Sequence, residues 1–231
     1  MNEEYDFELI GVQLEKAVAE EIPQPEQSAE HIPAPAKSEK KKLTPQQSFF
    51  KDARDILLII CLFMVVYTLF FRAVVVVGDS MFDTLASGDR LLVINNLIYT
   101  QPKRGDIIVA SKDSFRGGEC IIKRVIATEG QVVDIDFRTG TVYVDGQVID
   151  EPYIYAPTTQ PEGMKFPLKV EEGCIFVMGD NRPESMDSRN PIIGLIDERE
   201  VLGKAFFLIW PGTGTRDYPV EFDFLRIGGI N

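Results

Sequence analysis

The amino-acid sequence predicts a mainly β domain behind one N-terminal transmembrane helix. The helix is indicated by residues 56–71, an apolar run of sixteen residues without a charge. The β domain is indicated by seven short runs between residues 90 and 210, which are rich in Val, Ile and aromatic residues and bounded by Gly, Pro, Asn or Asp. No ten-residue helical period follows residue 71.

The chain begins with two segments of opposite charge. Residues 1–36 hold nine acidic residues against one lysine, together with four prolines, and are predicted to be a disordered tail. Residues 37–54 carry a net charge of +4, so we treat 1–43 as an acidic tail that ends in a basic juxtamembrane segment. By the positive-inside rule, these lysines place the N-terminus in the cytoplasm and the chain after residue 72 outside the cell membrane.

The predicted transmembrane helix covers residues 44–72. Thr44 is suited to the N-cap, Pro45 to the first helical position and Gln47 to the return bond of a capping box. The charge-free run spans about 24 Å, short of a hydrocarbon core of about 30 Å, so apolar neighbours at either end, including 73–77, must add length. A buried helix of a soluble core is disfavoured by the flanking lysines, and a cleaved signal peptide by the fifty residues before the run.

The rest of the chain, residues 73–231, is predicted to fold as an extracytoplasmic domain with an antiparallel core of six to eight strands. A Val-Asp-Gly-Gln turn predicts a hairpin inside 140–149. A hairpin-rich insertion is expected around residues 134–170. The predicted strands are 74–77, 90–99, 105–111, 119–128, 131–137, 140–149, 173–180 and 201–210.

Composition excludes several kinds of function. A net charge of -12 argues against nucleic-acid binding, which needs clustered Lys and Arg. The single histidine, His31, precedes every patterned segment, so a Ser/His/Asp triad, a Cys/His dyad or a His-rich zinc site in the folded part is excluded. Cys61, Cys120 and Cys174 show no CxxC spacing; free thiols or a Cys120–Cys174 bridge both stay open, and no metal or cofactor site is predicted.

Ser80 is the first candidate for chemistry. The apolar strand 74–77 leads into Gly78-Asp79-Ser80-Met81. The serine therefore follows Arg72, which marks the predicted membrane boundary, by eight residues. Most serines that follow Gly-Asp are ordinary turn residues, so the alternative to a nucleophile is a serine that only shapes the turn.

Lys123 is the second candidate. In a strand, Ile121, Lys123, Val125 and Ala127 share one face, so the lysine lies among apolar neighbours. One interpretation is an edge-strand lysine that discourages aggregation. The other is a desolvated lysine whose pKa falls far enough for the neutral amine to act as a base and replace the missing histidine.

A polar loop completes the set of candidate residues. Residues 179–189, GDNRPESMDSR, follow an apolar strand and pack charged and hydroxyl side chains into eleven residues. Ion pairs that only hold a loop together are the alternative explanation. The residues of interest are Asp180, Ser185, Asp187 and Arg189.

Taken together, these motifs resemble the type I signal peptidases, membrane-bound serine proteases with a Ser/Lys dyad. The resemblance covers roughly residues 55–210: the apolar span, then GDSMFDTL (78–85), RGDIIV (104–109), IIKRVIATEG (121–130) and GDNRPESMDSR (179–189). It implies a signal-peptidase-like antiparallel β catalytic domain. It also implies that the substrates are secretory preproteins with small residues before the cleavage site, and that the enzyme needs no cofactor.

The resemblance assigns roles to individual residues. Ser80 matches the nucleophile, Lys123 the general base and Ser185 the serine that hydrogen-bonds and orients the base. Asp187 and Arg189 match a supporting pair of opposite charge, and Arg124 and Asp180 are further supporting residues. The residues that match shallow substrate pockets are Val74, Val76, Met81, Leu85 and Ile122.

Two positions depart from the family pattern. The family often has Pro where this chain has Asp83, and some members have a serine where this chain has Gly78. Without that serine, a backbone N–H must supply more of the oxyanion stabilisation. Two alternatives to a signal peptidase remain: a Ser/Lys hydrolase with another substrate, as in self-cleaving repressors, and a membrane-tethered binding domain without catalysis.

Overall fold

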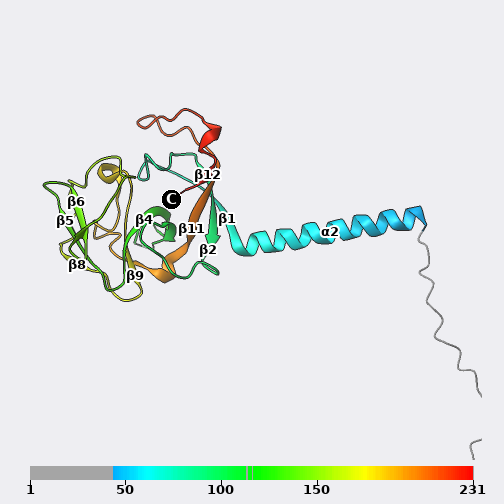
Figure 1. Ribbon diagram of the computed structural model, residues 1–231, viewed down its shortest axis with the longest axis horizontal. Helices are drawn as coiled ribbons and strands as arrows, with labels where there is room; N and C mark the ends of the chain where they lie inside the picture. The colour runs from blue at the N-terminus through cyan, green and yellow to red at the C-terminus, as the bar shows by residue number, and fades with distance from the viewer. Residues whose placement is uncertain (1–43, 113, 116, 231) are drawn as a thin grey trace, which may run out of the picture. The chain divides into compact units, whose positions relative to one another are not determined.

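The computed structural model describes residues 44–112, 114–115 and 117–230 (Figure 1). The predicted acidic tail, 1–36, and most of the basic segment after it therefore lie outside the described residues.

A single long helix, α2 (Pro45–Phe70), opens the described chain. The backbone N–H of Thr44 donates to Gln47 Oε1 at 3.1 Å, and the N–H of Gln47 donates to Thr44 Oγ1 at 3.4 Å. The predicted capping box is therefore confirmed, with Pro45 where its missing N–H costs no helical bond. The helix has 26 residues and is long and apolar enough to cross a membrane.

The C-terminal end of α2 differs from the prediction. The helix ends at Phe70 rather than residue 72, and strand β1 (Phe71–Val75) follows at once, so 73–77 cannot lengthen the helix. Pairing explains the difference, because Phe71 lies opposite Ile94 in a β ladder. The side-chain amide of Asn95 donates to the carbonyl of Leu69 at 3.2 Å. This hydrogen bond satisfies one of the carbonyl groups that have no donor within the helix at its C-terminal end.

An eight-stranded antiparallel sheet forms the larger part of the domain. Its order is β1-β2-β11-β3-β4-β9-β10, with β12 beside β11. The predicted core of six to eight strands is confirmed, whereas the two-residue strands β10 and β12 were not predicted. The further strands are β2 (Arg90–Asn95), β3 (Ile107–Ser111), β4 (Cys120–Thr128), β9 (Cys174–Met178), β10 (Ile196–Asp197), β11 (Val201–Trp210) and β12 (Gly228–Gly229).

A second sheet has the order β7-β6-β5-β8 and confirms the insertion expected around 134–170 (Figure 1). The hairpin between β6 and β7 turns at Asp145 (φ 54°) and Gly146 (φ 75°), the two left-handed residues that a type I′ turn requires. The strands are β5 (Val132–Asp136), β6 (Thr141–Val144), β7 (Gln147–Val148) and β8 (Leu168–Lys169).

Three apolar clusters form the core, and β4 contributes to all of them. Ile122 packs against the first, Ile121 and Val125 belong to the second, and Ile126 and Ala127 to the third. The predicted alternation of faces thus holds as far as Val125 and fails beyond it, because a register shift between Val125 and Ala127 puts two successive side chains into one cluster. All three cysteines are free thiols.

Candidate active site

Ser80 lies on the loop that follows β1. The loop is closed at its base, where Val76 N donates to Asp89 O at 2.8 Å and Gly88 N to Val76 O at 2.9 Å. Asn181 N donates to the carbonyl of Ser80 at 3.0 Å, which ties the serine backbone to the loop after β9. These bonds hold Ser80 between two segments that are far apart in sequence.

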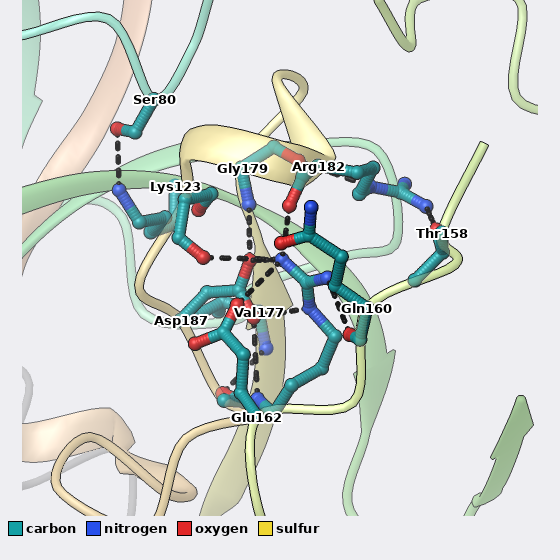
Figure 2. A network of polar contacts seen from close by, with 12 residues as sticks. Ser80, Lys123, Thr158, Gln160, Glu162, Val177, Gly179, Arg182 and Asp187 are labelled. Carbon is teal, nitrogen blue, oxygen red and sulfur yellow. Dashed lines mark hydrogen bonds and ion pairs between the residues drawn. The ribbon is translucent and has the colours of Figure 1, made fainter. Parts of the chain in front are cut away.

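Lys123 is buried, with 4% of its surface exposed, and lies on β4 opposite Ile108 of β3. β4 is an inner strand of the large sheet, because β9 pairs with its other side from Arg124 onward, so the interpretation as an edge-strand lysine is wrong. Its Nζ lies 2.6 Å from Oγ of Ser80 and 3.1 Å from the carbonyl oxygen of Ile122, both within hydrogen-bond range. Figure 2 shows Ser80 and Lys123 facing each other.

The surroundings of Lys123 favour its neutral form. Burial is the largest effect and lowers the pKa of the lysine from 10.5 to about 8. The carboxylates of Asp187, Asp180 and Glu162 act in the opposite direction, and the Arg189 guanidinium acts with burial. An amine with a pKa near 8 is about one-tenth neutral at pH 7 and half neutral at pH 8, and its neutral form can accept a proton from a hydroxyl in contact with it.

The next residue, Arg124, forms a buried bidentate pair with Asp180. Its Nε and Nη2 donate to the two carboxylate oxygens at 2.9 and 2.7 Å, and its Nη1 donates to Gly105 O at 2.9 Å. The guanidinium lies 3.9 Å from the ring centroid of Tyr153. Thr84, which lies four residues after Ser80 on the same loop, donates to Asp180 Oδ2 at 2.6 Å.

Asp187 and Arg189 form a second buried pair, as the sequence predicted. Two guanidinium nitrogens of Arg189 donate to the carboxylate at 2.8 Å each, and both side chains are fully buried. Asp187 also accepts from Gly179 N at 3.0 Å, and Arg189 donates to the carbonyls of Arg182 and Ser185. The pair therefore fixes the whole turn from residue 179 to residue 189.

Ser185 does not make the predicted bond to the base. Its Oγ is buried and has no hydrogen-bond partner among the described residues, because Lys123 Nζ is directed to Ser80 Oγ and Ile122 O instead. The hydroxyl is nevertheless close to the serine loop. A Cβ placed on Gly179 would lie 2.2 Å from Ser185 Oγ and 2.3 Å from Ser80 O, so only glycine fits between them.

A groove of about 980 Å³ opens in front of Ser80 and Lys123. Four of the five predicted pocket residues line it: Val74, Val76, Met81 and Ile122. Leu85 does not. It is fully buried in the first core cluster, because the turn that starts at Ser80 directs it into the domain rather than toward the groove.

Several residues of the site were not predicted from the sequence. Asn181 lies inside the quoted loop motif but was not singled out, whereas Arg182 was among the charged residues noted in the loop, without a role of its own. Glu151 and Glu162 come from the insertion and pair with Arg182 and Arg189, and no sequence pattern links them to the loop. In the part of the chain that the structure describes, no group of three His, Cys, Asp or Glu side chains could hold a metal ion.

Comparison with known proteins agrees with the resemblance. The model of the family described as "Signal peptidase, peptidase S26" matches residues 50–210. A signal peptidase I of Bacillus licheniformis is 35% identical over 182 residues, 75% of this chain and 95% of that protein. Signal peptidase I S of Bacillus subtilis (strain 168) is 31% identical over 180 residues, 74% of this chain and 94% of that protein. A crystal structure of a signal peptidase I from Enterococcus faecalis V583 is similar at 32% identity and a TM-score of 0.38, covering 45% of this chain and 96% of that one. The chain belongs to the signal peptidase family, peptidase S26.

Proposed function

We propose that this protein is a signal peptidase I, a membrane-anchored serine endopeptidase that removes N-terminal signal peptides from secreted preproteins. Its nucleophile is Ser80 and its general base is Lys123. The observation that carries this proposal is the 2.6 Å contact between Lys123 Nζ and Ser80 Oγ in a member of the peptidase S26 family. Burial of the lysine supports it, because a neutral amine is the form that can accept a proton.

The reaction proceeds in two stages. The neutral amine of Lys123 accepts the hydroxyl proton of Ser80 while Oγ attacks the carbonyl carbon of the scissile bond. The backbone N–H of Ser80 donates to the oxyanion, and the lysine ammonium gives its proton to the departing amine of the mature protein. Water then attacks the acyl-enzyme, Lys123 takes its proton, and the proton returns to Ser80 as the signal peptide leaves with a carboxylate.

The groove supports substrate binding as an added strand. β9 pairs with β4 only from Arg124 onward, so the stretch Cys120–Lys123 is paired with β3 on one side and borders the groove on the other. β1 is the first strand of the sheet and its residues line the same groove. A peptide between these two edges gains main-chain hydrogen bonds, and its alternate side chains meet Val76, Met81 and Ile122. We expect small side chains one and three residues before the cleaved bond.

The membrane helix supports the choice of substrate. The lysines before α2 favour a cytoplasmic N-terminus, which puts the domain after it outside the membrane. Ser80 follows the last residue of the helix, Phe70, by ten positions. The nucleophile is thus tethered close to the surface where a membrane-bound signal peptide presents its cleavage site.

The experiment is cleavage of a purified preprotein with an Ala-x-Ala site by the full-length protein in detergent. We expect the wild-type protein to cut after the second Ala, as read by the masses of both products. Ser80→Ala should be inactive, whereas the matched control Ser114→Ala, an exposed serine whose Oγ bonds Ile192 O, should cut normally. Cleavage by Ser80→Ala would overturn the assignment of the nucleophile. A folded wild-type protein that does not cut would favour a different substrate or a binding domain.

A further inference from the structure

The insertion between β4 and β9, which carries the second sheet, reaches back to the charged groups around Lys123. Its returning segment, 158–164, surrounds Arg189: Nη1 of the arginine donates to Gln160 O at 3.4 Å, and Met164 N donates to Arg189 O at 2.9 Å. Between these two contacts, the carboxylate of Glu162 lies 3.1 Å from Arg189 Nη2. Figure 2 shows Glu162 and Asp187 close together in this network.

The network holds one carboxylate more than it has arginines. Three arginines have a carboxylate at close range: Arg124 with Asp180, Arg182 with Glu151, and Arg189 with Asp187. Glu162 is the fourth carboxylate, and it shares Arg189 with Asp187. Among the described side chains of this network, the cation left to balance Glu162 is the ammonium of Lys123.

Lys123 faces charges from three segments. The turn 179–189 contributes Asp180, Asp187 and Arg189, and the insertion contributes Glu162. The serine loop contributes Ser80, with Asp79 beside it at the groove, where Glu184 also lies. On the neighbouring strand β3, the residue opposite the lysine is the apolar Ile108. Glu162 is one of three carboxylates that raise the pKa of Lys123, so the loss of its charge is measurable.

We propose that Glu162 is a positioning residue for the peptidase reaction: its carboxylate offsets the charge of Arg189 and so sets the pH range in which Lys123 is available as a base. The inference rests on the proposed role of Lys123. Glu162 is not among the residues that line the groove, and its ion pair is with Arg189, so it acts on Lys123 through the charge that it places in the network. Burial and the neighbouring Asp187 carboxylate raise the pKa of Glu162, and the cations Arg189 and Lys123 act in the opposite direction.

The test is the pH dependence of kcat/KM for Glu162→Gln on the preprotein substrate. Removing the negative charge disfavours the ammonium form of Lys123, so the neutral amine persists to lower pH. We expect the rising limb of the kcat/KM profile to shift to lower pH by roughly half a pH unit, the size typical of one charge in a partly screened network. The plateau at high pH should stay within about threefold of wild type, because no group in contact with the substrate has changed.

Controls separate a charge effect from a structural one. Glu171→Gln changes an exposed glutamate and should leave the rising limb of the kcat/KM profile at its wild-type pH. Glu162→Asp keeps the charge, so its rising limb should also lie at the wild-type pH. Glu162→Ser removes the charge with a shorter side chain and should repeat the downward shift if the Gln variant is unstable. An equal loss of activity at every pH, or an unmoved limb in both uncharged variants, overturns the inference. A wild-type protein without Ser80-dependent cleavage overturns the proposed function instead.

Discussion

Lys123 Nζ lies 2.6 Å from Ser80 Oγ, although the two residues are 43 positions apart and β1, the strand that precedes the Ser80 loop, is not a neighbour of β4. β2, β11 and β3 lie between β1 and β4 in the sheet. The contact is therefore made by the loop after β1, which hydrogen bonds to Asn181 and Asp180 hold against the turn that follows β9. The position of Ser80 Oγ relative to Lys123 therefore depends on the contacts that hold this loop.

Gly179→Ala should abolish cleavage. The new Cβ would lie 2.3 Å from the carbonyl oxygen of Ser80 and 2.2 Å from Ser185 Oγ, so the nucleophile loop must move. A misplacement of this kind costs about 100-fold or more in kcat, and overpacking costs about 1–3 kcal/mol of stability. Steady-state kinetics and thermal unfolding of the full-length variant measure the two effects.

The matched control for this change is Gly228→Ala. A Cβ at Gly228 meets nothing within 4 Å, so this variant should keep both its activity and its melting temperature. If Gly179→Ala cleaves as fast as Gly228→Ala, the loop is not held against Ser80 in the way described.

Asp187→Asn should destabilise the domain. The carboxylate is fully buried and pairs with Arg189, so its removal leaves a buried guanidinium without its closest counter-charge. Breaking a pair of this kind typically costs about 3–5 kcal/mol. Asp136→Asn is the control, because Asp136 pairs with an Arg138 that is 88% exposed, and its loss should change the melting temperature little. Equal melting temperatures for the two variants would show that the buried pair does not hold the turn.

The orientation in the membrane can be tested through a native thiol. Cys120 is exposed and lines the groove, whereas Cys174 is partly buried. In intact cells, a membrane-impermeant maleimide should label the wild-type protein and label Cys120→Ser far less. Labelling that requires cell lysis would place the domain in the cytoplasm and contradict the proposed orientation.

The sequence was most informative where function depends on short local patterns. The capping residues, the type I′ hairpin and the strand that carries Lys123 each depend on neighbours within a few positions, and each was found. Ser80 and Lys123 could be paired because the chain lacks a usable histidine and its motifs follow the order of a known family. Leu85 was wrongly predicted to line the substrate pocket. The turn that begins at Ser80 directs its side chain into the first core cluster, and the sequence motif does not indicate the direction of that side chain.

What the sequence could not predict depends on contacts between distant segments. The helix ends at Phe70 because Phe71 pairs with Ile94, which apolar periodicity cannot indicate. Glu162 joins the network because the insertion folds back on Arg189, and a lone glutamate in a polar segment carries no pattern. Ser185 illustrates a further limit: its position in the motif was informative, yet its hydroxyl makes no bond to Lys123.

The most direct measurement is kcat/KM for preprotein cleavage from pH 6 to pH 10 by the wild-type protein, with Lys123→Ala beside it. Burial lowers the lysine pKa, so the neutral base becomes available as the pH rises through about 8, and activity should rise with it. Lys123→Ala should lose at least about 100-fold at every pH. A rising limb centred near 8 that is absent from Lys123→Ala is the predicted result. A Lys123→Ala protein that cleaves with the wild-type profile would contradict the assignment of Lys123 as the base.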